Sequence, residues 1–159
     1  MIKVLFLCHG NICRSPIAEF VLKTLVAQAG LTPYFHIASA ATSTEEIWNG
    51  IGNPVYPPAR DILARHGISC AGKRAVRVQK SDYDEYDYLI CMDIQNIRNL
   101  TRITGPDREN KISLLLDYTS RKGQSIADPW YTGDFETTYR DVLEGCQALL
   151  EHLRREGKI

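Results

Sequence analysis

The feature that most limits the fold of this chain is an almost wholly apolar run at residues 2–8, followed by a tight polar loop. The run does not alternate apolar and polar residues, so it suits a central strand of a parallel sheet that is buried on both faces. The loop at residues 9–13 leads into a helix that begins near Pro16, a residue favoured in a first helical turn. Ligands of such sheets bind beyond the carboxyl ends of the strands, and Cys8 ends this strand. We therefore expect Cys8 and the loop to lie at a binding site.

Strand and helix patterns alternate along the rest of the chain. Apolar runs predict four strands, at residues 2–8, 34–41, 87–92 and 111–116. Helical periodicity predicts four helices, at residues 16–29, 59–66, 94–103 and 135–153. Longer loops are predicted at residues 42–58 and 117–133, and an acidic, solvated stretch at residues 82–86. This order predicts an α/β fold: a single-domain three-layer α/β/α sandwich over residues 1–159, with a central four-stranded parallel sheet (Rossmann-like).

Composition excludes several classes of function. The 19 basic and 19 acidic residues form no basic stripe, so we expect no nucleic-acid partner. No run is long enough for a membrane helix, and the short apolar run after Met1 is not a signal peptide, so we expect a cytoplasmic protein without a membrane partner. The odd number of cysteines predicts no disulfide framework, and their spacing predicts no zinc site. The five are Cys8, Cys13, Cys70, Cys91 and Cys146.

The residues that follow the first strand fit the binding of a tetrahedral oxyanion. Backbone N–H groups of a short loop can point inward as a nest, and the following helix adds the positive end of its dipole. Arg14 can hold two anion oxygens with its planar fork, although an arginine is also common in surface ion pairs. Cys8 lies where these positive potentials converge, so its thiolate is favoured and can attack phosphorus. Ser15 can stabilise this sulfur or simply cap the helix.

A second candidate group lies far along the chain. Asp128 is a candidate general acid for a leaving group, and Pro129 holds its backbone extended, although Asp-Pro is also common in ordinary turns. Trp130 and Tyr131 follow in a polar loop and can flank a substrate ring. Trp48, in the loop at residues 42–58, fits a pocket wall and a core lid equally well.

These motifs resemble a known family. The pattern Cys-x5-Arg-Ser is similar to that of the protein tyrosine phosphatases, and the N-terminal wording CHGNICRSP resembles their low-molecular-weight class. Further matching stretches are IASAATS at 37–43, IGNPVYPPA at 51–59, RHGI at 65–68, YDYLICMD at 86–93 and ADPWYTGDFE at 127–136. The resemblance implies a metal-independent protein-tyrosine-phosphatase without a cofactor. It assigns the nucleophile of a phosphocysteine mechanism to Cys8, the phosphate clamp to Arg14 and the general acid and base to Asp128.

The resemblance also assigns supporting roles. It places six residues in the phosphate-binding loop: His9, Gly10, Asn11, Ile12, Cys13 and Ser15. Ser39 and His66 are expected to hold Asn11, whose side-chain type tolerates the left-handed backbone of a tight nest. The alternative for His66 is a plain helix-end histidine. Cys13 either packs as a small side chain or, as the resemblance implies, forms a protective disulfide with Cys8. His9 departs from the small or apolar residue that is common after the nucleophile.

Other activities share the loop and stay open. An arsenate reductase needs two further cysteines as a relay, and Cys91 looks buried in a strand. A phosphoarginine phosphatase carries threonine where this chain has Ile12. A non-catalytic phosphate-binding or redox-sensing module is disfavoured by the joint presence of Cys8, Arg14 and Asp128. The expected partners are a phosphotyrosine-containing protein or a small aryl phosphate, with inorganic phosphate or other oxyanions as inhibitors, and a monomeric state is expected.

Overall fold

The predicted α/β sandwich is confirmed by a computed structural model that describes residues 1–159. Four parallel strands form the central sheet in the order β2-β1-β5-β6. Their bounds are Ile2–Cys8 (β1), Phe35–Ala41 (β2), Tyr88–Cys91 (β5) and Ile112–Leu114 (β6). The strand order reverses between β1 and β5, because the chain runs from β1 to β2 on one side and then crosses to β5 on the other. The crevice at this switch point is where such sheets bind ligands.

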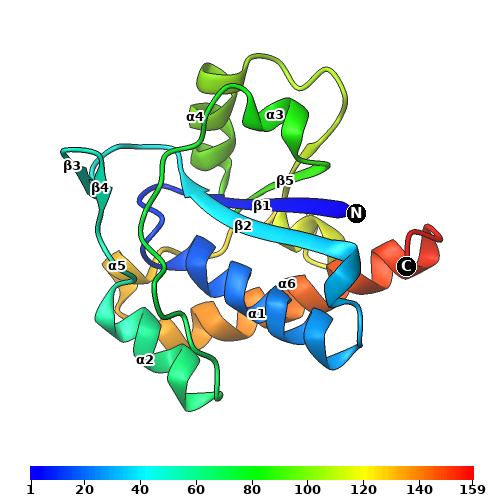
Figure 1. The fold of residues 1–159 in the computed structure, drawn as a ribbon, viewed down its shortest axis with the longest axis horizontal. Coiled ribbons are helices and arrows are strands. Elements are labelled where there is room, and N and C mark those ends of the chain that lie inside the picture. Colours follow the sequence, from blue (N-terminus) through cyan, green and yellow to red (C-terminus); the bar gives the residue numbers. More distant parts are fainter.

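Helices cover both faces of the sheet (Figure 1). One face carries α1 (Arg14–Gln28), α2 (Pro57–Arg65) and α6 (Phe135–Arg155), and the other carries α3 (Asp82–Glu85) and α4 (Ile94–Thr104). The side chains of β1 alternate between two cores, because Val4 and Phe6 pack toward α1 and α6 while Leu5 and Leu7 pack toward α4. Both sets are buried, as the unbroken apolar run predicted. No helix has the length and apolar content that crossing a membrane requires.

Several predicted boundaries need correction. Residues 42–58 are not all loop, since they include an antiparallel hairpin of β3 (Ile47–Trp48) and β4 (Ile51–Gly52) that turns through Asn49 and Gly50. The fourth strand ends at Leu114, because Asp117 accepts the Leu114 N–H and the chain turns into the 3₁₀ helix η2 (Leu115–Tyr118). A short 3₁₀ helix, η1 (Thr32–Tyr34), precedes β2, and the short helix α5 (Pro129–Thr132) lies in the second predicted loop.

The acidic stretch at residues 82–86 is only partly solvated. It forms α3, and its two tyrosines, Tyr83 and Tyr86, are buried in the smaller core. The Tyr83 hydroxyl donates to Asp107 at 2.6 Å and accepts the Glu109 N–H at 2.8 Å. The aromatic rings therefore fix this segment against the sheet, while its carboxylates face solvent.

Candidate active site

The loop between β1 and α1 surrounds the Cys8 sulfur with hydrogen-bond donors. The N–H groups of Asn11 and Ser15 point at Cys8 Sγ from 3.3 and 3.4 Å, and Ser15 Oγ lies 3.0 Å from the same atom. The Ser15 N–H belongs to the first turn of α1, so the helix dipole adds to the positive potential at the sulfur. The Cys8 sulfur therefore lies at the base of a loop whose N–H groups converge on it.

Asn11 holds the loop in its curved form. Its φ of 59° lies in the left-handed region, which asparagine tolerates better than most residues. Its side-chain NH₂ group donates to Ser15 Oγ at 2.8 Å and to Ser39 Oγ at 2.9 Å, and its oxygen accepts the Val76 N–H at 3.1 Å. Asn11 and Ser39 are each 1% exposed, so the network is shielded from water.

A buried ion pair continues this network behind the loop. The Ser39 hydroxyl donates to Glu19 Oε1 at 2.6 Å, while Lys73 Nζ donates to the Ser39 carbonyl at 2.9 Å and lies 3.5 Å from Glu19. Burial lowers the pKa of Lys73, and the Glu19 carboxylate opposes that shift. Glu19 was missed, although a carboxylate among the apolar residues of α1 signals a buried partner. Nothing in the sequence around Lys73 pointed to its role.

His66 is not part of this network, and its predicted supporting role is wrong. It follows the last turn of α2, is exposed, and stacks on Tyr139 with ring centroids 3.9 Å apart and planes at 6°. This contact joins α2 to α6, so His66 is a helix-end histidine. Glu19 and Lys73 occupy the position behind Ser39 that His66 was expected to fill.

Hydrogen-bond acceptors from segments that follow β5 hold the Arg14 guanidinium in place. Its Nη1 donates to Asp93 at 2.7 Å and to the Ile126 carbonyl at 3.0 Å, and its Nη2 lies 3.5 Å from Asp128 Oδ2. Arg14 is only 3% exposed. Burial alone would lower the pKa of Arg14, but Cys8, Asp93 and Asp128 raise it above its ordinary value, so the guanidinium stays charged.

Asp93 is a site residue that the sequence suggested only as a helix cap. It does cap α4, with the Asn96 N–H 2.7 Å from Oδ1, while its Oδ2 accepts from Arg14. The sequence signal was limited to its position, because Asp93 directly follows an apolar strand, and the strand order that puts β5 next to β1 came from the structure. Carboxylates at this edge of the sheet lie close to the ligand site of the β1 loop.

Asp128 lies at the mouth of the pocket. Its Oδ1 accepts the Trp130 N–H at 3.0 Å, and its backbone is extended ahead of Pro129. Its side chain is 26% exposed, so it can meet both a substrate oxygen and water. The structure therefore brings Asp128 to the same pocket as Cys8 and Arg14, from a position 120 residues further along the chain than Cys8.

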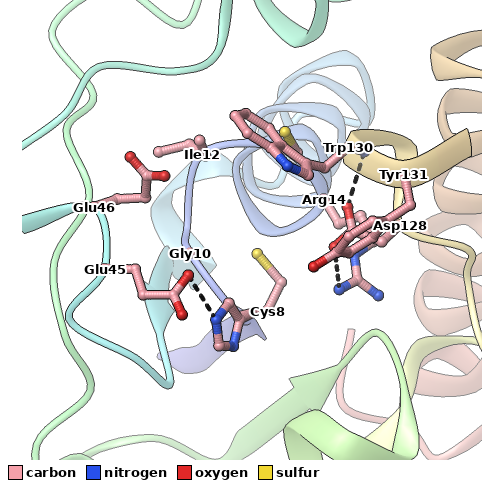
Figure 2. A pocket seen from close by; sticks show the side chains of 11 residues that line it. Cys8, Gly10, Ile12, Arg14, Glu45, Glu46, Asp128, Trp130 and Tyr131 are labelled. Carbon is pink, nitrogen blue, oxygen red and sulfur yellow. Dashed lines mark hydrogen bonds and ion pairs between the residues drawn. The ribbon is translucent and has the colours of Figure 1, made fainter. Parts of the chain in front are cut away.

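Two unlike walls rise above Cys8, as Figure 2 shows. Trp130 and Tyr131 from α5 form the aromatic wall and are 53% and 85% exposed. The opposite wall is formed by Glu45 and Glu46, which precede β3. Trp48 was an open candidate for a wall, but it lies within β3, is 80% exposed and does not line the pocket. The hairpin pairs Trp48 with Ile51 and leaves both exposed, while Glu45 and Glu46, just before it, line the pocket.

The remaining loop residues also line the pocket. His9 Nε2 lies 3.0 Å from Glu45 Oε2 and so connects the loop to the acidic wall. Gly10 and Ile12 line the same pocket. Burial and the nearby Cys8 raise the pKa of Cys13 to about 12, so this second cysteine is a neutral thiol. No group of three or more His, Cys, Asp and Glu side chains is placed to hold a metal ion.

Comparisons with known proteins agree with this geometry. The family model for low molecular weight phosphotyrosine protein phosphatase matches residues 3–159. The chain is 39% identical over 160 residues to low molecular weight protein-tyrosine-phosphatase YfkJ of Bacillus subtilis, covering 100% of both chains. It is 41% identical over 153 residues to the human low molecular weight phosphotyrosine protein phosphatase, covering 94% of both. The crystal structure of YfkJ superposes with a TM-score of 0.90 at 40% identity, over 98% of this chain and 96% of that one.

Proposed function

The chain belongs to the low molecular weight phosphotyrosine protein phosphatase family, and on this premise we propose that it hydrolyses phosphotyrosine through a phosphocysteine intermediate. Its relatives at 39–43% identity are protein-tyrosine phosphatases, and so is this chain. The observation that supports the residue assignment best is the convergence of two N–H groups and a hydroxyl on Cys8 Sγ, beside a buried Arg14.

In the first step, the Cys8 thiolate attacks phosphorus and the P–O bond to the aryl group breaks. The phosphoryl oxygens lie in the nest of loop N–H groups, and Arg14 balances their charge. Asp128, in its acid form, gives a proton to the departing phenolate oxygen. Ser15 Oγ, 3.0 Å from the sulfur, stabilises the thiolate before the attack.

In the second step, Asp128 accepts a proton from a water molecule as the water oxygen attacks phosphorus. The S–P bond breaks, which regenerates the Cys8 thiolate and releases the phosphoryl group as inorganic phosphate. One carboxylate serves in both steps because the proton that it gives in the first is replaced in the second. Arg14 holds the same oxyanion throughout, so phosphate and similar oxyanions should compete with substrate.

The aromatic wall supports an aryl ester as the substrate. Trp130 and Tyr131 rise above the sulfur and can flank the ring of a phosphotyrosine. A long aromatic ester reaches a nucleophile at the base of a pocket more readily than the shorter phosphoserine does. Small aryl phosphates should be hydrolysed for the same reason.

The direct test is hydrolysis of p-nitrophenyl phosphate without added metal and with a thiol reductant. The wild type should be active and Cys8→Ser inactive. Mass spectrometry after rapid acid quenching should find one phosphoryl group on the peptide that contains Cys8. Inactivity of a folded wild type would reject the proposal.

The role of Asp128 has its own test. Asp128→Asn should slow hydrolysis by about 100-fold or more, within the usual range for general acid–base groups, while phosphate still binds. The loss should be smaller for aryl phosphates with acidic leaving groups, which need no proton. An equal loss for all leaving groups would assign the acid elsewhere.

A further inference from the structure

A second cavity lies directly beside the active-site pocket. It has a volume of about 250 Å³ and shares three lining residues with that pocket: Ile12, Glu46 and Trp130. In Figure 2, Ile12 lies between Glu46 and Trp130 at the edge of the pocket. Because the two hollows share these residues, a side chain next to a phosphotyrosine bound over Cys8 can reach the second one.

The walls of this second cavity are mainly apolar and aromatic. The rings of Tyr56 and Trp130 lie 4.8 Å apart with their planes at 52°. Pro54, Val55 and Pro57 complete the apolar lining. Such walls accommodate a long aliphatic stem, and aromatic faces attract a cation at its end.

Glu46 supplies a carboxylate that no cation of this chain balances. Its carboxylate accepts from the neutral amide of Asn53 at 2.7 Å, and no Lys, Arg or His nitrogen lies within 4.0 Å of it. Glu45 differs, since it pairs with His9 at 3.0 Å. The hydrogen bond from Asn53 holds this carboxylate, and the half-buried Glu46 side chain lies over Gly10, where a Cβ would come within 3.2 Å of Glu46 Cγ. A fixed, unbalanced carboxylate beside two aromatic rings favours a cationic ligand.

One cation of the chain, Arg60, also lines this cavity. Its side chain is 60% exposed and lies 3.5 Å from Asp61 of the same helix. Water and that carboxylate screen its charge. The chain as a whole has no net formal charge, so no long-range field favours one sign of ligand. Glu46 is therefore the charged residue of this lining that has no ion-pair partner within the chain.

We propose that this cavity binds an arginine or lysine side chain adjacent to phosphotyrosine in the protein substrate, and that Glu46 selects it. The inference rests on the proposed phosphatase function and specifies its substrate class. The aliphatic stem packs on Tyr56 and Trp130, and the cationic end meets the Glu46 carboxylate. Glu46 is thus a specificity-determining residue outside the phosphate chemistry.

The test compares phosphotyrosine peptides that carry Arg, Gln or Glu immediately before or after the phosphotyrosine. In the wild type, kcat/KM should be about five-fold higher for Arg than for Gln at one of these two positions, the size expected of a partly exposed ion pair. This advantage should decrease at high ionic strength. In Glu46→Gln it should fall to within about two-fold. Glu151→Gln removes the same charge on an exposed face of α6 and should keep the full advantage.

Three results would overturn the proposal. They are equal kcat/KM for Arg and Gln peptides at both positions, an Arg advantage that survives in Glu46→Gln, and a preference for Glu peptides that Arg60→Gln abolishes. The last result would mean that the cavity takes an anionic neighbour. Failure of the proposed function looks different, since a folded wild type would then hydrolyse neither p-nitrophenyl phosphate nor any of the peptides.

Discussion

Asp93 should control catalysis through Arg14, and Asp93→Asn tests this while keeping the helix cap. One oxygen of Asp93 accepts the Asn96 N–H and the other accepts from Arg14 Nη1, both at 2.7 Å. Asparagine keeps one oxygen for the cap but turns an NH₂ group toward the guanidinium. Hydrogen bonds to charged groups contribute about 1.5–3 kcal/mol, so misplacing Arg14 should lower kcat/KM for p-nitrophenyl phosphate by about 10- to 100-fold.

The assay measures kcat/KM and inhibition by inorganic phosphate in the same variant. Both should weaken together, because Arg14 holds the oxyanion in substrate and product. Asp134→Asn is the matched control, since Asp134 caps α6 by accepting the Thr137 N–H at 3.0 Å and has no arginine within ion-pair distance. Asp93→Asn should also unfold at a lower temperature, because the same hydrogen bond stabilises the fold, so activity is measured well below the unfolding temperature of either variant. If Asp93→Asn weakens activity and phosphate inhibition no more than Asp134→Asn does, the reasoning about Arg14 is refuted.

Three further predictions concern stability. Asn11→Ala should lower the free energy of unfolding, measured in urea, by about 2–4 kcal/mol more than Asn49→Ala does. Both residues have positive φ, but only Asn11 forms hydrogen bonds in the buried network. Equal losses in the two variants would contradict this. Gly145→Ala should lower the free energy of unfolding by about 1–2 kcal/mol, although alanine has the better helix propensity. The reason is that the alanine Cβ would lie 2.4 Å from the buried Leu115 side chain. A higher urea midpoint in the variant would show that the core adapts. Burial raises the pKa of Cys13 from 9.0 to about 12, so as the pH rises the unfolded state loses this proton first. The free energy of unfolding should therefore fall between pH 9 and pH 12, and Cys13→Ala should reduce that fall by up to about 1.4 kcal/mol per pH unit. If urea titrations show the same pH slope in Cys13→Ala as in the wild type, this prediction is wrong.

The secondary structure was predictable where its signal is local. The second strand, expected at residues 34–41, spans Phe35–Ala41, and the helix expected at 94–103 spans Ile94–Thr104. Apolar periodicity and capping residues fix these elements within a few neighbouring positions. The β3–β4 hairpin was missed because its strands have only two residues each, too few to show a period. The burial of Tyr83 in α3 and of Tyr86 just after it was missed because three carboxylates, Asp82, Asp84 and Glu85, make this segment polar on average.

Cys8 and Arg14 could be recognised together because a single short loop joins them, and chain connectivity alone forces them near each other. The contacts of Glu19, Lys73 and Asp93 came only from the tertiary structure, since the strand order β2-β1-β5-β6 brings their segments to one edge of the sheet. The same holds for the two walls, where hairpin direction placed Glu46 at the pocket and Trp48 in solvent. By itself the sequence determined the fold class and the family, and it indicated the loop after the first strand as the candidate site. Which distant side chains support that loop was decided by packing, because distances between segments depend on strand order and turn direction, which no local pattern specifies.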